Sequence, residues 1–182
     1  MEKMKPGFIV VAMLILAAAF SRLIPHWPNF TAVAAIALFG GARFSNRLFA
    51  FLVPLAALFL TDLILGFHNT MLPVYIAFCI TVFLGISISK KQNAANLAMT
   101  AAGASVIFFL ITNFGSWLGM PFYSKDIAGL MQAYAAGLAF FHDGSMGVSP
   151  FINTLIGDLF YTFAIFGVFA LASQRVPALR AA

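Results

Sequence analysis

Few side chains in this chain could do chemistry, because 63% of its 182 residues are hydrophobic and only 8% carry a charge. Three of them stand inside apolar stretches: Asp62 in FLTDLILGF, Asp158 in LIGDLFYTF and the single cysteine, Cys79, in LPVYIAFCITVFLG. A carboxylate is costly in lipid, so it usually faces a bundle interior or a wet cavity. Each aspartate is therefore a candidate functional group, and the alternative is a packing role through Arg22 or a neighbouring helix.

The chain lacks the short motifs of the common enzyme classes. It contains no HExxH, CxxC or GxSxG, and no glycine-rich phosphate loop. We therefore expect no nucleotide bound by this chain, no nucleic-acid partner and no enzymatic activity of its own. A minor alternative is an intramembrane enzyme that uses Asp62, Asp158 or His26 as acid–base groups.

Apolar runs separated by turn and charge signals predict an all-α integral membrane protein, a compact bundle of six transmembrane helices in one domain, 1–182. The mean hydropathy of +1.01 agrees with this class. The segment 127–141 is apolar but only about 15 residues long, which favours an interfacial or re-entrant segment within an external loop, 119–150. The six predicted helices cover about 7–24, 31–43, 48–66, 71–88, 95–118 and 151–173.

The distribution of positive charge predicts the orientation, since short cytoplasmic loops retain Lys and Arg. With both termini in the cytoplasm, Arg22 and Lys125 are the two basic residues on the outer side. The other eight fall on the inner side: Lys3, Lys5, Arg43, Arg47, Lys90, Lys91, Arg175 and Arg180. An odd number of spans would move the last two outside, so an even number is favoured.

Most polar side chains gather at the predicted outer ends of the helices. Because successive helices alternate direction, residues far apart in sequence reach the same depth there. We expect this set to bind a substrate, with Asp158 in a structural role. The candidate residues are Arg22, His26, Asn29, Asp62, His68, Tyr75, Asn113, Trp117 and Asn153.

Small residues line one side of the second helix, at Ala34, Ala37 and Gly41. Such a face lets helix backbones approach closely, and internal packing is favoured over an external partner.

Cys79 lies about eight residues, or roughly 12 Å, below the outer end of its helix. Tyr75 stands one turn above it on the same face. From the residues alone, an inert packing thiol is favoured. The alternative is a thiolate offered to a metal at the floor of an outward-open cavity.

Three regions resemble a family of small bacterial transport proteins that includes the BtuM-type vitamin B12-binding subunits. They are RLIPHWPNFTAVAAIALFGGARF at 22–44, PLAALFLTDLILGFHNTMLPVYIAF at 54–78, and TNFGSWL with FINTLIGDLFYTFAIFGVFAL at 112–118 and 151–171. The family is similar to the substrate-binding S components of energy-coupling factor transporters. The resemblance implies a six-helix fold in the bacterial inner membrane and a substrate cavity near the outer surface.

The resemblance also implies that cobalamin is the transported ligand, with Cys79 as axial ligand to its cobalt and Tyr75 beside the corrin ring. The implied partners are cobalamin, the lipid bilayer and the energising module, a membrane coupling subunit with two ATPases. One feature departs from the pattern, because the first helix has no Ala-x-x-x-Ala pair. An S-component-like carrier for another vitamin or small solute, with Cys79 as packing only, is the second hypothesis.

Overall fold

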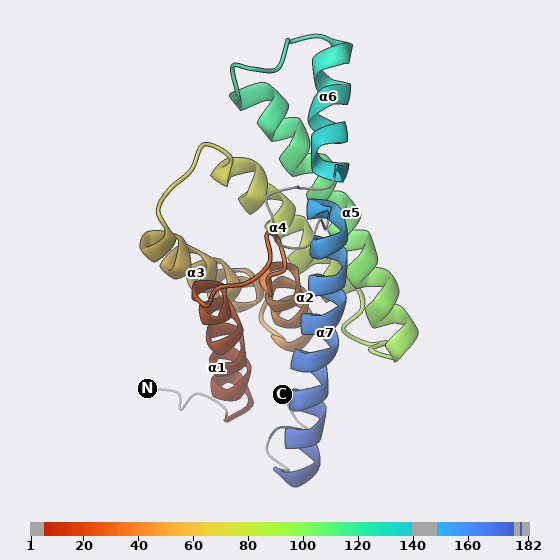
Figure 1. Ribbon diagram of the computed structural model, residues 1–182. Helices are drawn as coiled ribbons and strands as arrows, with labels where there is room; N and C mark the ends of the chain where they lie inside the picture. The colour runs from red at the N-terminus through yellow and green to blue at the C-terminus, as the bar shows by residue number, and fades with distance from the viewer. Residues whose placement is uncertain (1–5, 140–148, 177–178, 180–182) are drawn as a thin grey trace.

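A computed structural model describes residues 6–139, 149–176 and 179, and in these residues the protein is all-helical, without strands (Figure 1). The elements are α1 (Pro6–Phe20), the 3₁₀ turn η1 (Ser21–Leu23), α2 (Val33–Arg43), α3 (Arg47–Leu65), α4 (Met71–Ser87), α5 (Ala94–Gly119), α6 (Ile127–Leu138) and α7 (Pro150–Arg175).

Each of the six expected ranges holds one helix whose ends lie within two residues of the expected ones, counting η1 with α1. Four described helical segments are long and apolar enough to cross a membrane, which makes this a membrane protein. They are Pro6–Leu23, Arg47–Leu65, Ala94–Gly119 and Pro150–Arg175. The other two expected spans, α2 and α4, have 11 and 17 residues and are shorter.

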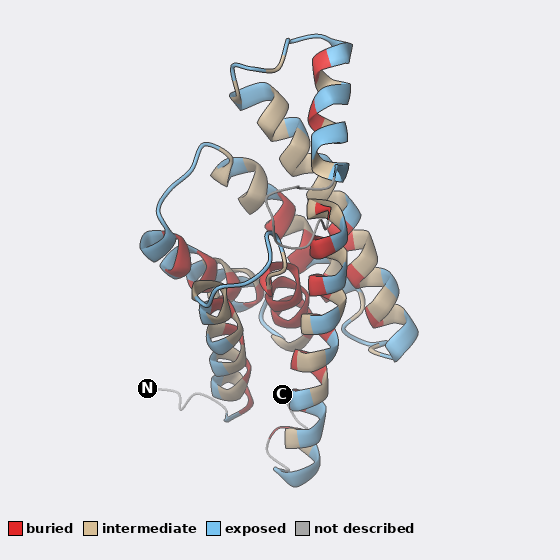
Figure 2. Ribbon diagram, viewed as in Figure 1, coloured by how far each residue is buried: buried red, intermediate tan, exposed pale blue. Residues whose placement is uncertain are grey.

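Helix α2 is the centre of the molecule rather than one of its lipid-facing walls. All ten residues from Val33 to Ala42 are buried, and the helix packs against α1, α3, α4, α5 and α7 (Figure 2). Its 11 residues extend about 16 Å, roughly half of the hydrocarbon thickness. A short helix that is apolar on every side can be buried in this way only because other helices surround it.

Two glycines allow α2 and α4 to touch through their backbones. A Cβ atom at Gly41 would overlap the carbonyl oxygen of Val82, and one at Gly85 would overlap the carbonyl oxygen of Leu38. Ala34 and Ala37, on the same side of α2 as Gly41, are also buried. The expected internal packing of this small-residue face is confirmed.

The segment expected to be interfacial or re-entrant contains α6, which runs antiparallel to the last turns of α5 and lies above the start of α7 (Figure 1). Asp126 caps α6 by accepting the N–H of Gly129 at 2.8 Å. The turn before it is fixed by Trp117, whose Nε1 donates to the carbonyl oxygen of Ser124 at 2.8 Å. Residues 140–148 of the expected loop lie outside the described residues.

The first turn of α1 and the last turn of α7 lie at the same end of the molecule (Figure 1). The α2–α3 and α4–α5 connections alternate along the chain with connections at the opposite end, and Arg43, Arg47, Lys90 and Lys91 lie in or directly beside them. This arrangement is the one that the charge pattern predicts for an even number of crossings. Lys3, Lys5 and Arg180 lie outside the described residues.

Candidate binding cavity

A cavity of about 330 Å³ lies where α2, α4 and α7 begin, against the second half of α5. Gly137, in the last turn of α6, stands at its edge and packs closely on the side chain of Asn113. The lining combines polar and apolar groups: Arg22, Asn29, Thr31, Val33, Ala34, His68, Thr70, Val74, Phe108, Phe109, Thr112, Asn113, Ser116, Gly137, Pro150, Phe151, Thr154 and Asp158.

The start of three helices at one cavity gives it a positive electrostatic bias. Thr70 immediately precedes α4, Pro150 is the first residue of α7, and Val33 is the first residue of α2. Each helix N-terminus carries about half a positive charge from its aligned peptide dipoles. An anionic or carbonyl group of a ligand is therefore favoured near these helix ends.

The first turn of α2 has backbone donors without acceptors in the described part of the chain. Its first helical hydrogen bond runs from the N–H of Ile36 to the carbonyl oxygen of Ala32, at 2.9 Å, and no side chain caps the helix. No acceptor is found among the described residues for the N–H groups of Val33, Ala34 and Ala35. Helix ends that are buried normally find such partners, in side chains, water or ligands.

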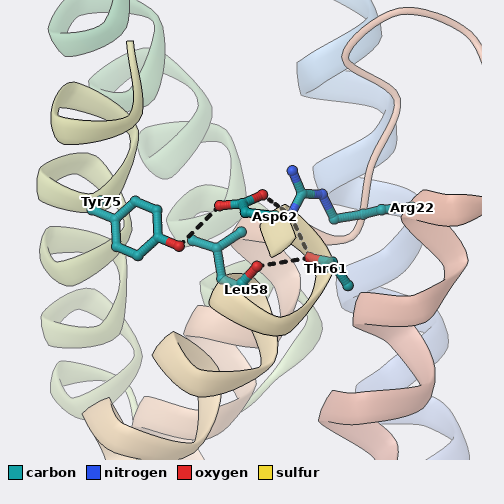
Figure 3. A network of polar contacts seen from close by, with 5 residues as sticks. All are labelled: Arg22, Leu58, Thr61, Asp62 and Tyr75. Carbon is teal, nitrogen blue, oxygen red and sulfur yellow. Dashed lines mark hydrogen bonds and ion pairs between the residues drawn. The ribbon is translucent and has the colours of Figure 1, made fainter. Parts of the chain in front are cut away.

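Arg22 joins the chain after α1 to α3 and α4 through Asp62. Its Nη1 donates to Thr61 Oγ1 at 2.6 Å and to Asp62 Oδ1 at 2.9 Å (Figure 3). The hydroxyl of Tyr75 donates to Asp62 Oδ2 at 2.9 Å. Both oxygens of a carboxylate that is 2% exposed are thus satisfied. The second terminal nitrogen of Arg22 points away from this network (Figure 3), and Arg22 lines the cavity.

Asp158 lines the same cavity but is held differently. It is 3% exposed, and its Oδ2 accepts the hydroxyl of Ser105 on α5 at 2.7 Å. No cation pairs with it among the described residues, and Oδ1 accepts no hydrogen bond from them. A buried carboxyl group without a cationic partner either carries a proton or requires a further hydrogen-bond donor.

Five of the residues selected from the sequence line this cavity. Arg22, Asn29, His68, Asn113 and Asp158 come from five separate parts of the chain and converge there. Asn29 adopts a left-handed backbone conformation, with φ of 63°, which asparagine tolerates well. The structure thus gives Asp158, expected to be structural, a place in the cavity as well.

Five others do not line the cavity, and four of them hold the surrounding structure instead. Asp62 and Tyr75 hold Arg22 in place, and Trp117 fixes the α5–α6 turn. Asn153, which is buried, donates from Nδ2 to the carbonyl oxygen of Pro28 at 2.8 Å and so ties the loop before α2 to α7. His26 is exposed, and its Nδ1 contacts the carbonyl oxygen of Ile24 at 2.6 Å.

Cys79 also lies outside the cavity lining. It is half-buried on the face of α4 that carries Tyr75, and Tyr75 reaches Asp62 on α3. The cavity meets α4 through Thr70 and Val74 instead. The thiol therefore does not line this cavity, and its role as axial cobalt ligand stays a prediction.

Sequence reasoning missed the hydroxyl and aromatic part of the lining. Thr112 and Ser116 are spaced four residues apart on α5, in register with Phe108, and Thr154 precedes Asp158 by one turn of α7. This i, i+4 spacing of hydroxyls in an apolar helix was the available signal. It is weak, because threonine and serine hydroxyls in helices commonly bond a backbone carbonyl, as Thr112 does to that of Phe108 at 2.7 Å.

In the described residues, the fold and the cavity define a helical membrane protein with a partly polar cavity where several of its helices begin. The chain belongs to a family of unknown function (DUF6580), whose model matches residues 2–179. Searches of curated proteins and of solved structures found no match.

Proposed function

We propose that this protein is a binding subunit of the bacterial inner membrane that captures a small polar solute for uptake. The observation that carries the proposal is the cavity of about 330 Å³, with charged, amide and hydroxyl groups from five separate parts of the chain beside aromatic and aliphatic side chains. A cavity of this size that combines apolar side chains with convergent polar groups is typical of small-molecule sites. The positive-inside distribution of Lys and Arg supports a cavity that opens to the outer side.

The size of the cavity favours a small solute over cobalamin. Drug-sized ligands occupy pockets of roughly 300–1,000 Å³, and cobalamin is much larger than such ligands. Cys79, the group proposed to bind cobalt, lies away from the lining. The geometry thus supports the second hypothesis from the sequence, an S-component-like carrier in which Cys79 is a packing residue.

An external source of energy is part of this proposal. The chain carries no nucleotide-binding motif, so uptake against a gradient would require the energising module, a coupling subunit with two ATPases. The lipid bilayer is the other partner.

Enrichment of a solute from a cell extract by the purified protein tests the proposal. Val74→Phe places a ring in the cavity, whereas Ile76→Phe places the same ring on the outward side of α4, where Ile76 is 46% exposed. We expect wild type and Ile76→Phe to enrich the same small polar compound in mass spectrometry, and Val74→Phe to lose it. Equal enrichment by all three proteins, or none by wild type, would contradict the proposed function.

A further inference from the structure

The cavity contains two unsatisfied polar groups of opposite character. One is the carboxyl group of Asp158, which receives a single hydrogen bond, from Ser105, and has no cationic partner among the described residues. The other is the first turn of α2, with backbone N–H groups that lack acceptors in the described chain. Because both groups face a polar cavity, a ligand can satisfy them together.

Arg22 adds a further hydrogen-bond donor for the negatively charged part of a ligand. Asp62 and Thr61 engage only its Nη1, and the second terminal nitrogen points away from them (Figure 3). The Arg22–Asp62 pair is neutral overall, and the donors available to a ligand include this nitrogen and the start of α2. A carboxylate is well matched to such a set of N–H donors.

The segments that carry the two groups pack against each other. A Cβ atom at Gly157 would lie 3.2 Å from the Cα of Phe30 and 3.2 Å from the backbone nitrogen of Thr31. Asp158 is therefore the next residue after the position where α7 packs against the segment that leads into α2. Because both groups line one cavity of about 330 Å³, a single small solute that carries a positive and a negative group can reach both.

We propose that the cavity selects a small zwitterion of the amino-acid type, with its protonated amine on Asp158 and its carboxylate on the first turn of α2 beside Arg22. The inference rests on the proposed function and specifies its substrate class. The apolar part of the solute would face Phe108, Phe109 and Phe151, which also line the cavity. A zwitterion supplies both missing partners and adds no net charge to a membrane-embedded site.

Thermal unfolding of the purified protein with a panel of free amino acids tests this inference. For each amino acid that stabilises the protein, the corresponding amine without the carboxylate and the corresponding acid without the amine are measured as well. For phenylalanine these probes are phenethylamine and 3-phenylpropionate. We expect at least one amino acid to stabilise the protein more than either of its two analogues.

The variant Asp158→Asn tests the amine subsite, because it keeps the shape of the side chain and cannot ionise. We expect the affinity for the amino acid to fall roughly 10–100-fold, and that for the matching acid to be unchanged or higher. Asp126→Asn, the same change in the cap of α6 away from the cavity lining, should leave both affinities unchanged. Infrared difference spectra of the wild-type protein provide a second measurement that needs no variant, and binding should change the carboxyl band of Asp158.

The outcomes separate the two claims. If neutral or singly charged probes bind and amino acids do not, or if Asp158→Asn binds the amino acid as wild type does, the zwitterion inference fails and the proposed binding function stands. If no compound from the panel or from a cell extract binds, both claims fail.

Discussion

Single residues in similar sequence contexts have different roles in this protein. Asp62 and Asp158 each precede a leucine within an apolar helix, and the sequence allowed each either a functional or a packing role. Asp62 is fully satisfied by Arg22 and Tyr75, whereas Asp158 has one partner and faces the cavity. The difference could not be predicted from the sequence, because the partners come from 13 to 53 positions away.

The Arg22–Asp62 pair should behave as a buried ion pair. Replacing Arg22 by methionine leaves an unpaired buried carboxylate, which we expect to cost about 3–5 kcal/mol of unfolding free energy. Tyr75→Phe removes one hydrogen bond and should cost about 1 kcal/mol. Reversible unfolding in detergent measures both. The double variant Arg22→Met with Asp62→Leu should recover part of the loss, and a double variant less stable than Arg22→Met alone would contradict the pairing.

Cys79 should be dispensable for solute binding, since it lies outside the cavity lining. We expect Cys79→Ala to enrich the same solute as wild type and to lose no more stability than a half-buried small side chain contributes. The absorption spectrum after incubation with cyanocobalamin and removal of free ligand provides the direct check. A corrin spectrum retained by wild type and abolished in Cys79→Ala would overturn the packing role and restore cobalamin as the substrate.

At the scale of the elements, the sequence predicted the positions of the helices but not the burial of α2. The period of apolar residues and the turn signals suffice to locate helices. They do not distinguish a helix surrounded by lipid from one surrounded by other helices, because both are apolar on every side. The length of α2, 11 residues, was the signal for a buried central helix.

The contact between α2 and α4 requires glycine at Gly41. Gly41→Val would force the backbones apart at Val82, and we expect it to cost about 1–3 kcal/mol or more, because a carbonyl group cannot move as a side chain can. Gly103→Val in α5 is the matched control, since a Cβ there meets nothing within 4 Å. Thermal unfolding followed by size-exclusion chromatography compares the two. Equal losses would show that Gly41 is not a close contact.

The start of α6 should depend on pH through Asp126. Hydrogen bonds from the backbone N–H of Gly129 and the hydroxyl of Ser124 lower the pKa of this carboxyl group. Because the folded-state pKa is below the unfolded value of about 3.9, the cap contributes fully above that value and is lost as pH falls through the folded pKa. Amide hydrogen exchange at Gly129, corrected for its intrinsic pH dependence, should show protection lost at low pH in wild type. The Asp126→Asn protein should lack this additional pH dependence.

At the scale of the whole molecule, charge patterning and alternation of helix direction predicted that polar residues converge at one end. Arg22, Asn29, His68, Asn113 and Asp158 do meet there. What could not be predicted was the division between residues that line the cavity and residues that hold it, such as Asn153 and Trp117. That division depends on side-chain direction and on α6, whose last turn reaches Asn113.

The central claim is that this family member holds one small polar solute in a cavity of about 330 Å³. Native mass spectrometry of the wild-type protein, released from lipid nanodiscs after incubation with a cell extract, tests it most directly. We predict one bound species per chain, with a mass far below that of cobalamin, and its absence from Val74→Phe. A bound species with the mass of cobalamin, or one that Val74→Phe retains, would contradict the account.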